Sequence, residues 1–299
     1  MQRAIRDYDR WNAWDRTSDR PFDDVKRDPA ANVLTGRWVK KPKVKDGKLV
    51  GRCRWTPRGF DQPEDEEGFD SPTAARTTYR TLKVVGLRKR WVKVLVDFSE
   101  AFFQSRQKTS SNLWTEVPPE DLPPGAGRTA RRLLVDVPGT RGAPRSWFET
   151  VRDVLLEIGC EQSRVDPCLF YVRGEPDEFG ETINGYIPLH VDDAEGMMLP
   201  EVADWLKKEL EERFLIGHFT IVPRGDEREF VGTRSVETDE GEHFDQQAYI
   251  DHKLQSVEIG KQRSKQREAL ATPDEVAQFR SANGRFMWIA VGSRPDCSY

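Results

Sequence analysis

The chain has 299 residues, of which 33% are charged, 36% are apolar and 10% are aromatic, and this composition is typical of a globular protein. At about 100–200 residues per domain, the length predicts two domains or one large domain with several lobes. The formal net charge is −4, from 47 basic and 51 acidic residues. This balance excludes a uniformly basic coat, but it allows a local site for nucleic acid.

The start of the chain mixes charges of both signs, and no run of about 18 apolar residues occurs anywhere, so we expect an intracellular protein without a membrane span. Its four cysteines form no CxxC pair, which predicts neither a zinc site nor a disulfide framework. Residues 1–30 are polar and contain two tryptophans, Trp11 and Trp14. We expect an irregular arm or a short helix with little chemistry there.

The segment from Gly36 to Arg58 is strongly basic, with nine lysines and arginines and one acid, a net charge of +8. Asp46-Gly47 lies between two alternating stretches, WVKKPKV and KLVGRCRW, and this pattern predicts a β-hairpin. We call residues 36–58 the basic ribbon. It is either an ordinary solvated hairpin or a surface that faces phosphates, and the nine-to-one ratio favours the second interpretation.

An acidic, turn-rich segment, FDQPEDEEGFDSP, predicts a connection between lobes, and RTTYRTLKVVGLRKR predicts a helix after it. Residues 91–96 then predict a buried strand that ends at Asp97. A carboxylate at the exposed end of a buried strand is a site candidate. Aspartate at such a position is more often a cap or turn residue, so Asp97 alone decides nothing.

Ala143-Pro144 predicts the start of an amphipathic helix that ends at Gly159. The strand CLFYVR follows, and YIPLHVDDAEGMML predicts a β-hairpin with Asp192-Asp193 at or beside its turn. In isolation, paired acids at a turn commonly serve only solubility. The rest of the chain predicts a packing helix over residues 201–214, a further hairpin over residues 220–244, and a terminal helix that begins with a capping box at Thr272.

Asp97, Asp192 and Asp193 together provide three carboxylates, one at a strand end and two at a hairpin turn. Mg²⁺ prefers oxygen ligands, and a pair of Mg²⁺ ions stabilises both the attacking and the leaving oxygen of an in-line phosphoryl transfer. Nucleotidyl transfer is therefore the favoured chemistry. It would also explain why an acidic protein keeps one basic ribbon, since a template and a triphosphate need a cationic surface.

The order of the motifs resembles the reverse transcriptases of Ty1/copia-type retrotransposons over roughly residues 20–299. VDFSEAFFQS resembles the family's D-V-K-T-A-F-L-N-G strand, and LHVDDAEGMM resembles its L-Y-V-D-D hairpin. GRWVKKPKVKDGKLVGRCRWTPRGFDQ, the block from VPGTRGAPRSW to DPCLFYV, FVGTRSV and SANGRFMWIAVGSRPDCSY match further blocks in the same order, and QQAYIDHKL is a weak seventh match.

The resemblance implies an α+β fold of the right-hand polymerase type. The divisions it suggests are an N-terminal arm over residues 1–30, fingers and palm over 31–240, and a thumb-like part over 241–299. It implies an RNA-directed DNA polymerase that uses two Mg²⁺ ions, with Mn²⁺ as an alternative, and acts on an RNA or DNA template, a primer strand and dNTPs. The expected location is the cytoplasm, in a virus-like particle, with the nucleus as a second location. We expect that the chain stops where a connecting segment and ribonuclease H would begin.

The resemblance also assigns site residues. Metal ligands would be Asp97, Asp192, Asp193 and the backbone carbonyl of Phe98, and the three aspartates would be catalytic. The residues expected to bind the incoming nucleotide are Phe102, which would bar ribonucleotides, Arg52, Arg54, Arg58 and Arg141. The residues expected to bind template and primer are Lys40, Lys41, Lys43, Lys45 and Lys48.

Three positions depart from the family pattern. His190 stands where the family has tyrosine, Gly142 where it has glutamine, and Arg141 where it has lysine. These departures put activity in question rather than the fold. The alternative function is therefore a decayed or co-opted element that binds nucleic acid through the basic ribbon but no longer polymerises.

Overall fold

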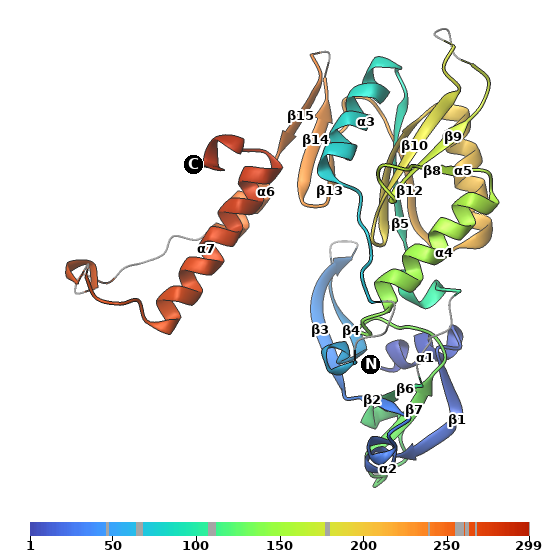
Figure 1. Cartoon of the computed structure of the whole chain (residues 1–299), viewed down its shortest axis with the longest axis vertical. Coiled ribbons are helices and arrows are strands. Elements are labelled where there is room, and N and C mark those ends of the chain that lie inside the picture. The colour runs from blue at the N-terminus through green and yellow to red at the C-terminus, as the bar shows by residue number, and fades with distance from the viewer. Residues whose placement is uncertain are drawn as a thin grey trace. The chain divides into compact units, whose positions relative to one another are not determined.

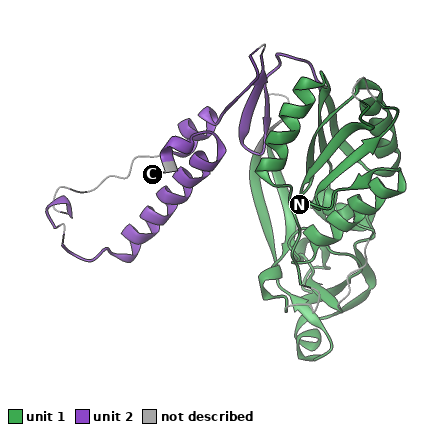
Figure 2. Cartoon of the chain, turned by 45° about the horizontal axis from the view of Figure 1, so that its top comes forward, with its two compact units in different colours: residues 1–221 green, residues 222–299 purple. Residues whose placement is uncertain are grey.

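The computed structural model describes the whole chain apart from residues 46–47, 64–67, 107–111, 177–179, 239, 255–259, 261–262, 267 and 299. The chain forms two compact units, residues 1–221 and residues 222–299 (Figure 2). Helices and sheets occur in both units, so the α+β prediction is confirmed. The predicted division into arm, fingers, palm and thumb-like part is a finer one, and it stays a prediction.

A six-stranded sheet, here called the central sheet, has the most strands among the described sheets of the first unit (Figure 1). Its strands lie in the order β12-β5-β11-β10-β9-β8. The strand β11 pairs antiparallel with β5 and with β10, and β9 pairs antiparallel with β10 and with β8. Their bounds are β5 Val92–Phe98, β8 Glu161–Gln162, β9 Leu169–Arg173, β10 Ile183–His190, β11 Asp193–Met198 and β12 Ile216–Val222. The predicted hairpin around Asp192-Asp193 is confirmed as β10 and β11.

Helices cover both faces of the central sheet. Because side chains alternate along a strand, Val94, Val96 and Phe98 of β5 share one face, and they pack with α4 (Ala143–Glu157) and α5 (Pro200–Arg213) in the main hydrophobic core. On the other face, α3 (Arg76–Arg88) packs against β11. A Cβ at Gly86 of α3 would lie 2.5 Å from the side chain of Met197, so the glycine permits this close packing. All three helices were predicted from the sequence.

The N-terminal sheet has four strands in the order β1-β7-β6-β2 and lies in the same unit. The strands are β1 Trp14–Pro21, β2 Asn32–Leu34, β6 Leu113–Glu116 and β7 Thr129–Leu133, and they are accompanied by the helices α1 Gln2–Arg10 and α2 Phe22–Arg27. The expectation of an irregular arm or a short helix over residues 1–30 is confirmed for the short helices α1 and α2, but it missed the strand β1. Trp14 of β1 and Tyr8 of α1 are buried together in a second hydrophobic core instead of facing solvent.

The basic ribbon is a two-stranded antiparallel sheet of β3 (Gly36–Lys45) and β4 (Lys48–Pro57), as predicted. The predicted turn Asp46-Gly47 lies outside the described residues. Trp38 faces Trp55 across the pair, with ring centroids 5.3 Å apart, and Trp55 is buried in the second core. The base of the ribbon is therefore anchored to the N-terminal sheet.

The second unit contains a three-stranded antiparallel sheet and two α-helices among its described residues. Its elements are β13 Arg228–Phe230, β14 Thr233–Glu237, β15 Glu242–Asp245, α6 Gln247–Lys253 and α7 Pro273–Gly292. A three-stranded sheet thus replaces the predicted hairpin. The predicted capping box is confirmed, because Thr272 accepts a hydrogen bond from the backbone of Glu275 while the Glu275 carboxylate accepts one from the backbone of Thr272. No helix in the described part of the chain is long and apolar enough to cross a bilayer.

Candidate functional site

The three predicted carboxylates come together at one end of the central sheet. Asp97 of β5 lies directly opposite Asp193 of β11, so their side chains share a face, while Asp192 stands in the turn that precedes β11. The backbone N–H of Phe98 donates to the carbonyl of Asp192 over 3.1 Å, which ties the strand end to the turn. By strand alternation, Asp97 and Asp193 lie on the α3 side of the sheet, away from the main core.

The turn between β10 and β11 is held in an unusual conformation. Val191 has a φ of 53°, in the left-handed region that a β-branched residue rarely adopts. The indole nitrogen of Trp147, a fully buried residue of α4, donates to the carbonyl of Val191 over 2.9 Å. A core helix thus fixes the turn that carries Asp192, and backbone strain of this kind is commonly found at functional sites.

Like charges surround Asp193. Burial raises the pKa of this carboxyl to about 6, and the negative charges of Asp192 and Asp97 contribute in the same direction. On the neighbouring strand, burial lowers the pKa of His190; the charge of Asp192 opposes this shift, and that of Arg76 adds to it. The site is therefore an acidic cluster that a bound cation would relieve.

The three aspartates supply hard oxygen donors, the chemistry that Mg²⁺ prefers. Within the described residues, however, no three His, Cys, Asp or Glu side chains are close enough together to hold a metal ion as they stand. The donor set therefore fits a divalent cation in kind, and the carboxylates share a sheet end without forming a finished coordination shell.

Arg54, one of the predicted nucleotide-binding residues, lies within electrostatic reach of Asp192. Burial and the charge of Arg52 lower its pKa, and the charges of Asp192 and Glu100 act in the opposite direction. Arg54 and Arg52 share one face of β4, since side chains alternate along a strand. The ribbon thus brings cationic charge to the same end of the sheet.

The predicted lysines do not form a single surface. Lys41 lies opposite Arg52 and therefore shares its face, whereas Lys40 lies opposite Cys53 on the other face. The side chains of Lys43, Lys45 and Lys48 lie outside the described residues. Lys40 and Lys41, which the sequence analysis assigned to one binding surface, therefore lie on opposite faces of the ribbon.

The other predicted nucleotide-binding residues, Phe102, Arg58 and Arg141, differ in their exposure and in their contacts. Phe102 belongs to the short 3₁₀ helix η2 (Ala101–Gln104) and packs, partly buried, against the main core. Arg58 is exposed just after β4. Arg141 donates to the carbonyl of Gln62 over 3.1 Å and stacks on the ring of Phe69, 4.6 Å from its centroid, so it makes structural contacts within the chain.

Comparison with known proteins gives a consistent result. Residues 21–270 match the family described as reverse transcriptase (RNA-dependent DNA polymerase). The chain belongs to this family. Members of the family generally use divalent metal ions.

Two Arabidopsis thaliana proteins, the retrovirus-related Pol polyproteins from transposons RE2 and RE1, are each 23% identical to the chain, over 91% and 93% of its length. The chain spans 19% of the length of each, and these relatives support the copia-type assignment. A solved foamy viral protease-reverse transcriptase in complex with double-stranded DNA matches with a TM-score of 0.37 and 14% identity, covering 84% of this chain and 37% of that one.

One departure from the family's pattern has a local structural reason. A Cβ at Gly142 would lie 2.8 Å from the carboxylate of Asp136, which is buried and accepts hydrogen bonds from Thr140 and Ser146. A glutamine at position 142 would displace this carboxylate from the start of α4. Gly142 therefore fits its own surroundings in this chain.

Several residues near the aspartates were missed by the sequence analysis. Glu100 has a φ of 55° and accepts a 2.7 Å hydrogen bond from the indole nitrogen of Trp11, which follows α1. Behind the site, Lys83 of α3 forms a buried ion pair with Glu195 of β11, with 3.0 Å between nitrogen and oxygen. The positive φ of Glu100 and the pairing of distant segments leave no mark in a single sequence.

Proposed function

We propose that this chain extends a primer strand by template-directed addition of deoxynucleotides, as an RNA-directed DNA polymerase of a copia-type retrotransposon. The observation that carries the proposal is the direct pairing of Asp97 with Asp193 beside a turn that bears Asp192. Family membership supports the same reaction class. The partners would be an RNA or DNA template, a primer and dNTPs.

Asp97, Asp192 and Asp193 would hold two Mg²⁺ ions, with the carbonyl of Phe98 as a backbone ligand and Mn²⁺ as a substitute ion. Bound metal would lower the barrier by stabilising the oxygens that attack and leave in phosphoryl transfer. The crowding of negative charge around Asp193 supports this assignment, since a cation would remove the repulsion.

The basic ribbon would bind the phosphates of the nucleic acid and of the incoming nucleotide. Arg54 and Arg52 are the strongest candidates for the triphosphate, because their shared face carries charge towards Asp192. Arg58 and Arg141 would act at the edge of this surface. Lys41 would contact the same strand as Arg52, and Lys40 would contact nucleic acid only from the opposite face.

A primer-extension assay tests the proposal. We expect the purified chain to extend a labelled DNA primer on an RNA template when Mg²⁺ and dNTPs are present, and to stop when EDTA is added. Filter binding of the same primer–template is measured in parallel. Binding without extension would contradict the polymerase assignment and support a co-opted element that only binds nucleic acid.

A further inference from the structure

Gly217, near the start of β12, lies against the carboxylate of Asp97. A Cβ with ideal geometry at this position would lie 2.1 Å from Oδ2 of Asp97 and 2.8 Å from Oγ of Ser99. Both separations are shorter than a Cβ atom tolerates from a non-bonded oxygen. The glycine therefore leaves the space that the Asp97 side chain occupies.

Space, and not backbone conformation, explains the glycine. Gly217 does not have a positive φ, unlike Gly225 and Gly232 later in the chain, so an alanine would meet no backbone strain there. The nearest atom to a new methyl group is the end of the Asp97 side chain, which can rotate. An alanine would thus leave the strand intact and move the carboxylate.

The backbone at the start of β12 has little freedom to withdraw, because Gln104 fastens it to the end of β5. The amide oxygen of Gln104 accepts from the backbone N–H of Leu215 over 2.6 Å, and its nitrogen donates to the carbonyls of Ser99 over 2.7 Å and Leu215 over 3.2 Å. The N–H of Ser99 also donates to the carbonyl of Leu215 over 3.0 Å. Three of these hydrogen bonds hold Leu215 beside the residues that follow Asp97, and the fourth fixes Gln104 itself to Ser99.

We propose that Gly217 and Gln104 are positioning residues for Asp97. Gln104 holds β12 at a fixed distance, and the bare backbone of Gly217 forms the wall against which the Asp97 carboxylate rests in the orientation that receives the metal ion. This inference rests on the proposed function of Asp97. It explains why a strand that carries no catalytic group borders the catalytic one.

The test compares Gly217→Ala with Gly127→Ala. Gly127 lies in the same unit, has open space around its Cβ position and has no positive φ, so its alanine variant is a matched control. Binding of Mn²⁺ to the complex of protein with primer–template is measured from the EPR signal of the free ion, beside thermal unfolding and the Mg²⁺ dependence of extension. We expect Gly217→Ala to weaken Mn²⁺ binding at least about tenfold and to slow extension by up to about a hundredfold, as for a misplaced catalytic group.

The control should match the wild type in all three measurements, and Gly217→Ala should unfold at nearly the wild-type temperature. A Gly217→Ala protein that binds Mn²⁺ within about threefold of the wild type would overturn the inference. Asp97→Asn in the same assay separates the two claims. If Asp97→Asn extends primers normally, the proposed function fails; if it is inactive while Gly217→Ala is normal, only the positioning role fails.

Gln104→Ala supplies an independent measurement. Releasing β12 should relieve the collision that Gly217→Ala creates, so the double variant should bind Mn²⁺ more tightly than the two single effects predict when added. Strict additivity of the two substitutions would contradict the role given to Gln104.

Discussion

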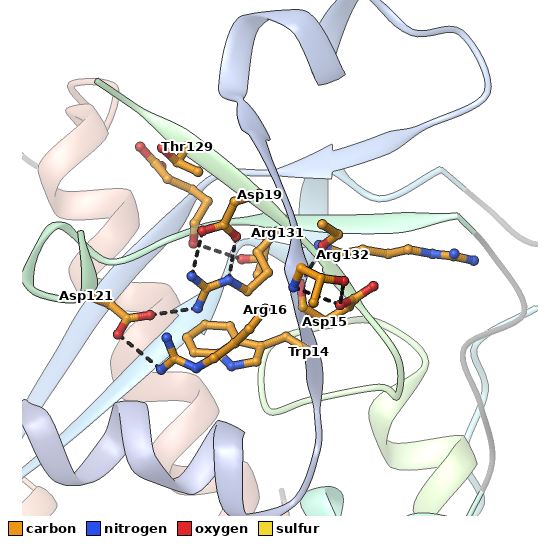
Figure 3. Close-up of polar contacts among 12 residues, drawn as sticks. Trp14, Asp15, Arg16, Asp19, Asp121, Thr129, Arg131 and Arg132 are labelled. Carbon is orange, nitrogen blue, oxygen red and sulfur yellow. Dashed lines mark hydrogen bonds and ion pairs between the residues drawn. The ribbon is translucent and has the colours of Figure 1, made fainter. Parts of the chain in front are cut away.

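Two groups of three carboxylates lie in the first unit, and their surroundings differ. In the N-terminal sheet, the buried guanidinium of Arg131 pairs with Asp19 and Asp121 at 2.6 Å each, and Arg16 also pairs with Asp121 (Figure 3). Arg16 pairs with Asp9 as well. Burial acts to lower the pKa of Arg131, but its hydrogen bonds to Asp19 and Asp121 outweigh this and raise it. The hydrogen bond from Arg16 lowers the pKa of Asp9.

At the end of the central sheet the pattern is reversed. Asp193 is partly buried and lies near two further carboxylates, those of Asp192 and Asp97. Burial and both negative charges raise its pKa. Within the described residues, neither Asp193 nor Asp97 forms an ion pair. The acids of the N-terminal sheet are neutralised within the fold, whereas those of the proposed catalytic site are left for a ligand to neutralise.

The sharpest test of this contrast pairs Asp97→Asn with Asp121→Asn. Loss of a metal ligand should reduce primer extension by about a thousandfold, roughly 4 kcal/mol of barrier, with nearly unchanged unfolding. Asp121→Asn should lower the unfolding temperature and leave the extension rate nearly unchanged, because it removes the partner of Arg131 and Arg16 and lies outside the proposed metal site. Extension rates and thermal unfolding of both variants check this, and an active Asp97→Asn protein would break the contrast.

Arg131→Met should lower the free energy of unfolding by about 3 kcal/mol, because it leaves Asp19 and Asp121 without their buried partner. It also removes the guanidinium that stacks on Trp14 at 4.6 Å. The control is Arg132→Met, whose exposed side chain follows on the same strand; it should change stability by less than about 0.5 kcal/mol. Equal denaturant midpoints for the two variants would show that the network contributes nothing specific.

Two adjacent phenylalanines connect the two regions. Phe102 packs on the main core, while Phe103 packs on the second core, with its ring centroid 5.1 Å from that of Tyr8. Phe102→Val should admit ribonucleotides if the ring crowds the sugar 2′-hydroxyl, and Phe103→Val should only destabilise, by about 1–4 kcal/mol. The ratio of dNTP to rNTP incorporation decides. An unchanged ratio in Phe102→Val would leave Phe102 with a packing role alone.

Much of the central sheet could be predicted from the sequence, because its signals are local. The run Val94-Leu95-Val96, the amphipathic helix that follows Ala143-Pro144 and the hairpin around Asp192 each occupy one continuous stretch. The order of the motifs then assigned the three aspartates to one site. The N-terminal sheet escaped prediction because β1 pairs with β7, more than a hundred residues later, and neither strand has the alternating pattern of a half-buried strand.

The surroundings of the site were also beyond reach. The roles of Gly217 and Gln104 depend on where β12 lies beside β5, and the pairing of Trp11 with Glu100 depends on where α1 packs. The nine basic residues of the ribbon could be counted, but the register decides which share a face. Residue type predicts chemistry, whereas tertiary contact decides which groups meet.

The smallest expected effect concerns the stability cost of the acidic cluster. The pKa of Asp193 is raised to about 6, so between about pH 4 and pH 6 the folded chain binds more protons than the unfolded chain. Its contribution to stability is therefore full in acid and is lost as the pH rises through 6. In EDTA at pH 7.5, Asp193→Asn should be more stable than the wild type by about 1 kcal/mol, since the half-buried site is partly screened, and the difference should vanish near pH 4.

Added Mg²⁺ should stabilise the wild type more than the variant, because only the folded wild type offers all three carboxylates. The exposed Asp204 of α5 supplies the control, Asp204→Asn, which should show neither effect. Melting temperatures that do not depend on pH in this way would show that Asp193 is compensated like the acids of the N-terminal sheet.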